Sequence, residues 1–379
     1  MKGNVIVGQS GGPTAVINSS LAGVYRTAVD RGAKKVYGML YGIQGLLDEQ
    51  YVDLSKYIRS DLDVEILKRT PSAFLGTCRY KLPDIHENQE IYVKIFEILN
   101  KLNIECFIYI GGNDSMDTIK KLSDYAILTG QSQKFVGVPK TIDNDLALTD
   151  HTPGYGSAAK YIATSTKEVI RDGIGFSYKK QQVIIIEIMG RNAGWLTGAA
   201  ALSRGEDCDG PDLIYLPELT FDIEKFTAKV RKLLVKKDVV VVAVSEGIRI
   251  QDGRYVSELG SASDYVDAFG HKQLTGTASY LANVIHRDIG CKTRAVEFST
   301  LQRSAAHLAS RVDVNEAFMV GGAAVKAADE GDSGKMVVID RVSDDPYQCA
   351  TGIYDVHKIA NNEKTVPRAW LNETADYVT

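Results

Sequence analysis

Short apolar runs alternate with longer amphipathic stretches along the whole chain, and this alternation constrains the fold more than any other feature. Two of the runs, residues 183–186 and 239–242, contain only valine and isoleucine. A strand buried on both faces has such an uninterrupted run, whereas a half-exposed strand alternates apolar and polar residues. Strands that alternate with helices form a mostly parallel sheet with helices on both faces. The chain is therefore expected to have an α/β fold.

The individual elements follow from the same periodicities. Strands are expected at residues 4–8, 34–40, 104–110, 134–138, 182–188, 213–216, 238–245, 292–298 and 335–341. Helices are expected at residues 15–31, 87–102, 114–128, 155–171, 192–204, 222–236, 273–288 and 312–330. An Asp252-Gly253 turn predicts a small surface hairpin, and a second small hairpin is expected within residues 347–357.

The bulk composition narrows the class of protein. The 379 residues are 44% hydrophobic and 24% charged, which is ordinary for a globular protein and suggests two or three packed units. A net charge of −4 argues against a nucleic-acid-binding surface. The five cysteines are scattered and lack CxxC spacing, so reduced thiols in a cytoplasmic protein are expected rather than zinc or disulfides. The absence of a signal peptide or long apolar run predicts no membrane attachment.

The segment Pro-Lys-Thr-Ile-Asp-Asn-Asp at residues 139–145 concentrates reactive groups. It follows the apolar run 134–138, so it is expected at the carboxyl end of a strand, where ligands bind in open α/β sheets. Residues two apart in an extended segment point to the same side, so Asp143 and Asp145 are expected to face one site. A carboxylate can take a proton from a substrate hydroxyl, and Lys140 can neutralise a phosphate.

Two glycine-rich turns also follow expected strands, at residues 8–14 (Gly-Gln-Ser-Gly-Gly-Pro-Thr) and 111–115 (Gly-Gly-Asn-Asp-Ser). The backbone N–H groups of such a turn and the following helix N-terminus can bind a phosphate. The alternative is a tight turn with a polar residue that caps the helix. Neither turn matches GxGxxG or a P-loop. Asp114 would repel a phosphate, so it indicates metal binding or the exclusion of a longer polyphosphate.

Further charged residues follow the later strands. Arg191 comes directly after the run 182–188 and Met-Gly, where its forked guanidinium is placed to bind a phosphate. Glu246, Arg294 and Arg303 lie further along the chain. Each of these alone would more often be a surface charge or a helix cap. Their recurrence just past strand ends favours a ligand-binding edge.

Taken in order, these segments resemble the phosphofructokinase family over most of the chain. The matching elements are Ser10-Gly11-Gly12, Phe74-Leu75-Gly76-Thr77-Cys78-Arg79, Gly111-Gly112-Asn113-Asp114-Ser115, Pro139 to Asp145, Met189-Gly190-Arg191, Ser245-Glu246-Gly247, Thr293-Arg294 and Leu301-Gln302-Arg303. The lysine-bearing Thr-Ile-Asp-Asn-Asp element and the Met-Gly-Arg element are highly specific, whereas the glycine turns are not. The resemblance implies two similar three-layer units and transfer of a phosphoryl group to the 1-hydroxyl of fructose 6-phosphate.

The resemblance also implies a role for each matching residue. Asp143 is the general base, and Lys140 and Asp114 are further catalytic residues. Asn113 and Asp114 bind Mg²⁺, the expected cofactor. The residues that bind the phosphoryl donor are Gly11, Gly12, Arg79, Asn113 and Lys140. The residues that bind the sugar phosphate are Thr141, Ile142, Asp143, Asp145, Met189, Gly190, Arg191, Glu246, Arg294, Thr300, Leu301, Gln302 and Arg303.

Two positions indicate the phosphoryl donor. ATP-using members of the family resemble Gly-Gly-Asp-Gly where this chain has Gly-Gly-Asn-Asp, and they commonly carry a small residue at the position of Lys140. Members similar to this chain, with both Asp114 and Lys140, use pyrophosphate. The charges agree, because Asp114 would repel the α-phosphate of a nucleotide and Lys140 would stabilise charge on pyrophosphate. The expected activity is therefore the reversible pyrophosphate-dependent reaction.

Three residues depart from the family pattern. Asn113 stands where the family has a magnesium-binding aspartate, so the ion is expected at Asp114, through water, or mainly on pyrophosphate. Thr300 replaces an aromatic residue or histidine that contacts the sugar, which leaves open whether sedoheptulose 7-phosphate is also accepted. Gln182 stands where a neighbouring subunit usually supplies an arginine, and the lysines at positions 179 and 180 are candidates to replace it.

Three other functions remain as alternatives. An ATP-dependent 6-phosphofructokinase has the same fold, a non-catalytic sugar-phosphate-binding regulatory subunit would be expected to lack Asp143, and a lipid or NAD kinase lacks the Thr-Ile-Asp-Asn-Asp element.

The resemblance implies a cytoplasmic homodimer or homotetramer. It also implies a donor-binding domain over residues 1–150 with part of the C-terminal region added by chain crossover. After this domain the resemblance implies a sugar-phosphate-binding domain over residues 151–310. The last part, residues 311–379, is expected to be a crossover and C-terminal segment.

Overall fold

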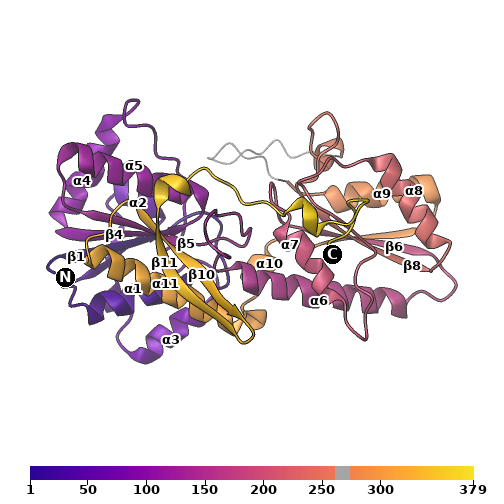
Figure 1. The fold of residues 1–379 in the computed structure, drawn as a ribbon, viewed down its shortest axis with the longest axis horizontal. Coiled ribbons are helices and arrows are strands. Elements are labelled where there is room, and N and C mark those ends of the chain that lie inside the picture. The colour runs from indigo at the N-terminus through magenta and orange to yellow at the C-terminus, as the bar shows by residue number, and fades with distance from the viewer. Residues whose placement is uncertain (261–273) are drawn as a thin grey trace. The chain divides into compact units, whose positions relative to one another are not determined.

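The computed structural model describes residues 1–260 and 274–379, and these divide into two compact units (Figure 1). Unit 1 contains Met1–Ser157 and Arg303–Glu363, and unit 2 contains Ala158–Gln302 and Lys364–Thr379. The chain therefore passes three times from one unit to the other. The division expected from the sequence had its boundaries after residues 150 and 310.

Unit 1 is built on a seven-stranded sheet in the order β11-β10-β5-β4-β1-β2-β3. The five central strands run parallel, whereas β11 and β3 at the two edges are antiparallel to their neighbours. The strands are β1 (Asn4–Gln9), β2 (Val36–Met39), β3 (Tyr51–Asp53), β4 (Ile104–Gly111), β5 (Lys134–Pro139), β10 (Lys335–Asp344) and β11 (Tyr347–Asp355).

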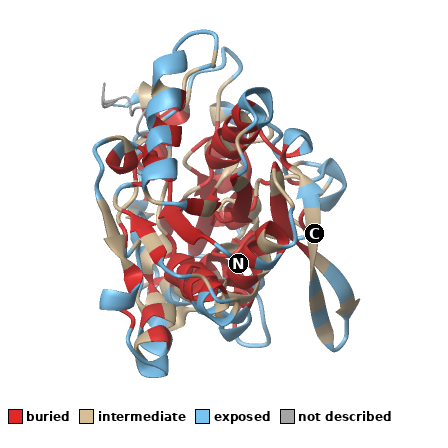
Figure 2. Ribbon diagram, turned by 90° about the vertical axis from the view of Figure 1, so that its left-hand side faces the viewer, coloured by how far each residue is buried: buried red, intermediate tan, exposed pale blue. Residues whose placement is uncertain are grey.

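Two helical layers cover this sheet, one on each face. The first layer is α1 (Ile17–Asp30), α3 (Asp61–Arg69) and α11 (Arg311–Asp329), and the second is α2 (Gly42–Leu47), α4 (Gln89–Lys101) and α5 (Asn113–Thr129). Successive strand residues alternate between the faces, so Val5 and Val7 belong to the first apolar core and Ile6 to the second. The buried sheet between exposed outer helix faces is visible in Figure 2.

Unit 2 has an entirely parallel four-stranded sheet in the order β7-β8-β6-β9. Its strands are β6 (Gln182–Ile188), β7 (Leu213–Tyr215), β8 (Val239–Ser245) and β9 (Lys292–Glu297). Helices α8 (Ile223–Leu234) and α9 (Thr277–Ile289) bury one face together with Val240 and Val242. Helix α6 (Tyr155–Gly175) packs on the other face, where Gly173 lies against Ile184. The expected three-layer α/β architecture is therefore confirmed.

Most expected elements are present within a few residues of their predicted bounds. The expected helix at 273–288 corresponds to α9, although residue 273 lies outside the described residues. The Asp252-Gly253 hairpin is present as one antiparallel bridge between Arg249 and Tyr255. Strands buried on both faces were the easiest to predict, because their sequences are apolar at nearly every position.

Other expectations were wrong or incomplete. The second small hairpin is instead one strand, β11, which pairs with β10 along its length. The helix expected at 192–204 begins only at Trp195 as α7 (Trp195–Gly198) and continues as a 3-10 helix over Ala199–Ser203. Elements α2, α3 and β3 were not expected.

Helices α1 and α11, which lie almost 300 residues apart in sequence, approach until their backbones touch. A Cβ atom on Gly23 would lie 2.0 Å from the carbonyl oxygen of Phe318, and a Cβ atom on Gly321 would lie 2.1 Å from that of Ser20. A backbone carbonyl cannot move aside as a flexible side chain can. Glycine is therefore required on both helices, and this contact fixes α11 against the N-terminal part of unit 1.

Replacing Gly321 with alanine should lower the free energy of unfolding by about 1–3 kcal/mol, because the added methyl group overpacks a backbone contact. Gly175→Ala is the control, since no heavy atom lies within 4 Å of its added Cβ and alanine favours a helix. Urea denaturation measures both variants. Equal losses in the two proteins would contradict the close-contact explanation.

Candidate active site

Three adjacent parallel strands of unit 1, β1, β4 and β5, end at one edge of the sheet, and predicted polar segments follow each of them. Residues 10–12 follow β1, residues 112–114 follow β4, and residues 140–145 follow β5. The strand register places Gln9 opposite Ile110, so the loops begin side by side. This edge is the site that the strand-end rule predicts for open α/β sheets.

Lys140 lies buried at this edge and is only 4% exposed. Its ammonium donates hydrogen bonds to the carbonyl oxygens of Gly12, at 2.8 Å, and Ser10, at 3.2 Å. Both acceptors belong to the first glycine-rich turn. The turn after β1 therefore holds the lysine that follows β5.

Four charged side chains act on Lys140. Burial lowers the pKa of Lys140 to about 8, the carboxylates of Asp143 and Asp145 oppose this shift, and the guanidiniums of Arg79 and Arg303 add to it. Three cations and two carboxylates are thus gathered at one edge. Such a group of cations suits an anion rich in phosphate oxygen atoms, and the carboxylates suit hydroxyl groups or a metal ion.

Gly11 and Gly12 leave space for these cations. Gly11 has a φ of +75°, and a Cβ atom there would lie 3.0 Å from Lys140 Nζ. A Cβ atom on Gly12 would lie 3.1 Å from Arg303 Nη1. A tight turn alone would explain glycine at position 11 through its positive φ. At position 12 an added Cβ atom would crowd the nearby guanidinium.

Asp143 lies in a turn and not in the extended segment expected from the sequence. Asn144 has a φ of +54°, in the left-handed region. The hydroxyl of Thr141 donates a hydrogen bond to Asp143 Oδ2 at 3.0 Å and accepts one from the Asp143 N–H at 3.2 Å. The two carboxylates still lie close together, since Asp143 contributes to the raised pKa of Asp145. The turn produces this proximity, so the alternation argument was wrong.

Asp145 and Asn113 present buried oxygen atoms without partners. In the part of the chain that the structure describes, neither Asp145 Oδ1 nor Asn113 Oδ1 has a hydrogen-bond partner. A long hydrogen bond of 3.5 Å joins Asn113 Nδ2 to Asp145 Oδ2. Burial, together with the nearby carboxylates of Asp143 and Glu363, raises the pKa of Asp145 to about 7. Because such oxygen atoms cost free energy, the pair indicates a cation-binding position.

The second glycine-rich turn is not a simple helix cap. Helix α5 begins at Asn113, its N-cap is Gly112, and no side chain caps it. Asp114 lies in the first helical turn and is half-buried. Asn113, Asp114 and Ser115 lie inside α5, so none of them is its N-cap residue.

In unit 2, side chains from other segments hold the loop after β6. The Met189 N–H donates to Gln302 Oε1 at 3.1 Å, and the Gly190 N–H donates to Glu246 Oε1 at 3.5 Å. The hydroxyl of Ser245 donates to the Gly190 carbonyl oxygen. Gly190 has a φ of +140°, which only glycine adopts readily. The structure thus brings together four of the residues predicted for the sugar phosphate.

The two predicted phosphate-binding arginines of unit 2 lie at different levels of its sheet. Arg191 lies in the loop after β6, which ends at Ile188. Arg294 lies within β9 opposite Ile184, four residues before that end, and pairs with Asp172 of α6 at 3.2 Å. Four residues of strand span about 13 Å. The structure does not place Arg294 at the carboxyl edge of this sheet, and its role stays a prediction.

The remaining predicted residues lie around α10 (Leu301–Ser304). Thr300 and Leu301 are exposed, whereas Gln302 is 2% exposed. Arg303 belongs to unit 1 and lies with the cations around Lys140 described above. Gln182 is buried at the start of β6, at the opposite end of that strand from its ligand-site loop.

Two positioning residues were missed in the sequence. The Thr152 hydroxyl donates to the Thr141 carbonyl oxygen at 2.6 Å, and its N–H donates to Asn144 Oδ1 at 3.1 Å, which fixes the turn around the candidate base. Glu187, buried at the end of β6, accepts from the Ala278 N–H at 2.8 Å, and burial raises its pKa to about 7. An acidic residue inside an apolar run signalled Glu187, but no local pattern signalled Thr152.

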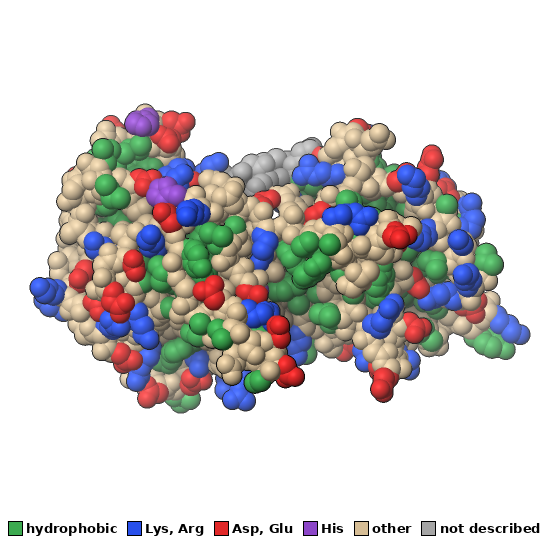
Figure 3. Space-filling view, in the orientation of Figure 1, with side chains coloured by type: hydrophobic (Ala, Val, Ile, Leu, Met, Phe, Trp, Pro, Cys, Tyr) green, Lys and Arg blue, Asp and Glu red, His purple; other side chains and the backbone are tan. Residues whose placement is uncertain are grey.

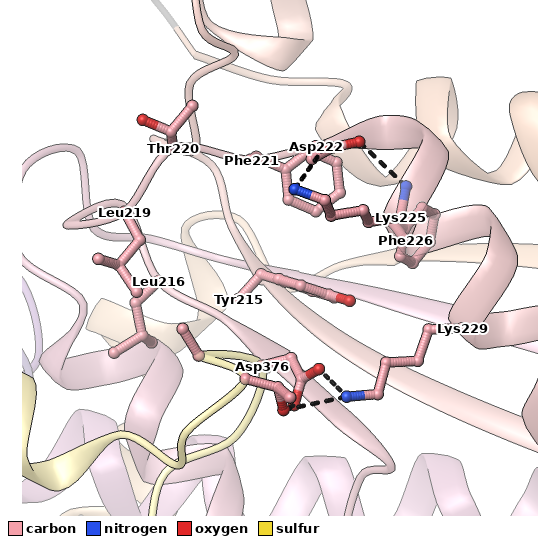
Figure 4. Close-up of a pocket in the computed structure, with 12 residues that line it drawn as sticks. Tyr215, Leu216, Leu219, Thr220, Phe221, Asp222, Lys225, Phe226, Lys229 and Asp376 are labelled. Atoms are coloured by element: carbon pink, nitrogen blue, oxygen red, sulfur yellow. Dashed lines mark hydrogen bonds and ion pairs between the residues drawn. The ribbon is translucent and has the colours of Figure 1, made fainter.

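A separate pocket of about 350 Å³ lies in unit 2, and its lining includes none of the predicted site residues (Figure 4). Its lining residues are Tyr215, Leu216, Leu219, Thr220, Phe221, Asp222, Lys225, Phe226, Lys229, Thr374, Ala375 and Asp376. On the face shown in Figure 3, basic and acidic side chains are interspersed over each unit. Among the helices of residues 1–260 and 274–379, none is long and apolar enough to span a membrane.

Comparison with known proteins agrees with this geometry. The family model described as Phosphofructokinase matches residues 4–328. A pyrophosphate--fructose 6-phosphate 1-phosphotransferase of Xanthomonas campestris pv. campestris is 43% identical over 377 residues, covering 100% of this chain and 89% of that protein. A protein of the same name from Halomonas elongata is 40% identical, covering 99% of this chain and 89% of its own length. The crystal structure of a pyrophosphate-dependent phosphofructokinase from Nitrosospira multiformis has a TM-score of 0.88 and 36% identity, covering 99% of this chain and 89% of that one. The chain belongs to the phosphofructokinase family.

Proposed function

We propose that the protein transfers a phosphoryl group from pyrophosphate to the 1-hydroxyl of fructose 6-phosphate, and that it does so reversibly. The observation that carries this proposal is the buried Lys140 ammonium, held by the glycine-rich turn with Asp143 and Asp145 nearby. A buried charge requires partners, and a small polyanion would supply the strongest one here. The relatives named above carry this activity in their names, which supports pyrophosphate as the donor.

The donor binds at the cationic edge of unit 1. Lys140, Arg79 and Arg303 neutralise the negative oxygen atoms of pyrophosphate, and the backbone at Gly11 and Gly12 approaches them closely because it carries no Cβ atoms. Asp114, in the first turn of α5, disfavours the additional phosphate of a nucleotide by charge repulsion. Charge at this edge thus selects a short polyphosphate.

The acceptor is activated by Asp143. The Thr141 hydroxyl holds one carboxylate oxygen, so the other can take the proton of the sugar 1-hydroxyl. The sugar oxygen then forms a bond to the terminal phosphorus, and the bond from this phosphorus to the bridging oxygen breaks. Inorganic phosphate leaves, and Lys140 stabilises the charge that develops on it. In the reverse direction Asp143 returns the proton.

The buried oxygen atoms of Asn113 and Asp145 fit a magnesium ion. A hard cation would give each orphaned oxygen a partner and would favour the ionised form of Asp145. Among the described residues, no group of three or more His, Cys, Asp or Glu side chains could hold a metal, so pyrophosphate and water must supply most of the ligands. When bound, magnesium would neutralise negative charge on the phosphates. Asp145 thus joins Asn113 and Asp114 as a proposed metal contact.

The sugar phosphate binds at the loop after β6. Arg191 pairs with its phosphate, and Glu246 and the backbone around Met189 and Gly190 contact its hydroxyl groups. Gln302 positions the loop through its hydrogen bond to Met189. For the remaining predicted contacts, Ile142, Thr300, Leu301 and Arg294, the proposal rests on family resemblance alone. A homodimer or homotetramer in the cytoplasm likewise stays a prediction.

Initial rates with magnesium and fructose 6-phosphate should be high with pyrophosphate and at least about 100-fold lower with ATP.

Asp143→Ala should remove nearly all turnover, because it removes the base, but calorimetry should still detect fructose 6-phosphate binding. Glu224→Ala, which removes an exposed carboxylate from the first turn of α8, is the control. A clear preference of the native protein for ATP would overturn the donor assignment, and full activity of Asp143→Ala would overturn the mechanism.

Donor selection can be tested by substituting each of the two charged residues, Asp114 and Lys140, separately. Asp114→Gly should raise the rate with ATP, because it removes charge repulsion against a nucleotide. Lys140→Gly should slow turnover with pyrophosphate by on the order of 100-fold, because it removes a cation from the leaving phosphate. Steady-state kinetics with both donors measure these effects. Retention of the full pyrophosphate rate in Lys140→Gly would contradict the role of the lysine.

The pH dependence of the reaction should report Lys140. Its lowered pKa of about 8 means that it is charged below pH 8 and loses its proton as the pH rises through that value. The ratio of kcat/KM for pyrophosphate between the native protein and Lys140→Met should therefore be largest below pH 8 and fall above it. Taking the ratio cancels the ionisation of pyrophosphate itself. A ratio that stays constant from pH 7 to pH 9.5 would exclude Lys140 as the titrating group.

A further inference from the structure

The last residues of the chain, Lys364–Thr379, fold back onto unit 2. Near their end, the Asp376 carbonyl oxygen accepts a hydrogen bond of 2.7 Å from the Ile214 N–H of β7, and the Asp376 carboxylate pairs with Lys229 of α8. The lysine and aspartate lie in the wall of the separate pocket (Figure 4). Asp376 is only 5% exposed. This end of the segment is therefore firmly anchored to the unit.

Glu218, which lies between β7 and α8, connects the beginning of the same segment to the loop that follows β6. The Oε1 atom of Glu218 accepts hydrogen bonds from the Gly194 N–H at 2.8 Å and from the Val366 N–H at 2.9 Å. Burial raises the pKa of Glu218, and the two N–H donors oppose that shift. One carboxylate oxygen thus joins the ligand-site loop to the C-terminal segment.

Trp195 makes a second connection at the same place. Its indole Nε1–H donates to the Lys364 carbonyl oxygen at 2.8 Å, and its ring meets the Trp370 ring edge to face at 5.4 Å between centroids. The Lys364 ammonium lies 5.6 Å from the Trp195 ring centroid. We call Gly194, Trp195, Glu218, Lys364, Val366 and Trp370 the tail latch.

The tail latch contacts the loop that follows β6 at the last residue of this loop, Gly194. Residues 189–194 contain no regular secondary structure, and Gly190 has a positive φ. Gln302 and Glu246 hold the beginning of this loop, and Glu218 holds its end at Gly194. A Cβ atom on Gly194 would lie 2.7 Å from Glu218 Oε2, so the close approach requires glycine there. Arg191 lies between the two supports.

We propose that Glu218 and Trp195 are positioning residues, which use the seated C-terminal segment to hold the Arg191 loop in its sugar-phosphate-binding conformation. This inference rests on the proposed function of the loop and adds a determinant of sugar-phosphate affinity that touches no substrate. The effect is confined to one substrate, because the donor is assigned to the cationic edge of unit 1. Loosening the latch therefore raises KM for fructose 6-phosphate and leaves KM for pyrophosphate unchanged.

Kinetics of latch variants test this separation. Glu218→Ala should raise KM for fructose 6-phosphate about tenfold, because it removes two hydrogen bonds to a charged acceptor, with kcat and KM for pyrophosphate changed by less than about twofold. Glu218→Gln keeps the carbonyl acceptor and should restore most of the affinity. Trp195→Phe removes one neutral hydrogen bond and should raise the same KM about threefold. The exposed Glu224, on the first turn of α8, supplies the control Glu224→Ala.

The two tryptophans of the latch are the only ones in the chain, so intrinsic fluorescence reports the latch directly. Fructose 6-phosphate should change the tryptophan emission of the native protein and of Glu224→Ala, and it should change that of Glu218→Ala much less. Pyrophosphate alone should leave the emission unchanged. This readout requires binding and not turnover.

The outcomes separate the latch from the proposed function. A native protein that binds fructose 6-phosphate in calorimetry and changes its emission, but does not use pyrophosphate, would refute the proposed reaction and support the latch. Binding without an emission change, together with an unchanged KM in Glu218→Ala, would refute the latch alone. Equal rises in both KM values would also refute it, because they indicate general damage. If Glu218→Ala does not fold, Glu218→Gln and Trp195→Phe decide the question, and absence of sugar-phosphate binding refutes both proposals.

Discussion

The burial of one lysine ammonium at the meeting point of three parallel strands is the constraint on which the rest of this edge of unit 1 depends. Removing this charge from water is costly, as its lowered pKa shows. Hydrogen bonds to the carbonyl oxygen atoms of Ser10 and Gly12 offset part of that free energy. Coulombic attraction to Asp143 and Asp145 offsets another part. The glycines, the turn and the carboxylates are therefore parts of one electrostatic arrangement, which a phosphate-rich anion completes.

The two units use the same strand-end geometry in different ways. In unit 1, charged side chains converge on an edge shaped by glycine turns, so the arrangement favours binding by charge. In unit 2, the loop after β6 is shaped by hydrogen bonds that its backbone N–H groups donate to polar side chains such as Gln302 and Glu218. The first arrangement can hold a small symmetric anion, and the second is suited to recognising the shape of a sugar.

The sequence predicted most of the strands and the position of the polar segments at their ends, because apolar runs and glycine turns are local signals. Helix α3 was missed although Ser60 and Asp63 provide a capping pattern, in which the Ser60 side chain accepts from the Asp63 N–H. The turn at Asn144 and the pairing of Glu218 with Gly194 could not be predicted. Both depend on tertiary contacts, and a contact between residues far apart in sequence leaves no local periodic trace.

The glycine contact between α1 and α11 has a consequence for synthesis of the chain on the ribosome. Unit 1 lacks α11, one of the three helices that cover one face of its sheet, and β10, the strand beside β5, until residues beyond 340 have been made. Most of unit 2 is contiguous and emerges before that point. The N-terminal half of unit 1 therefore keeps part of one apolar face uncovered while most of unit 2 is made, so unit 1 begins first in the sequence but cannot complete its core first.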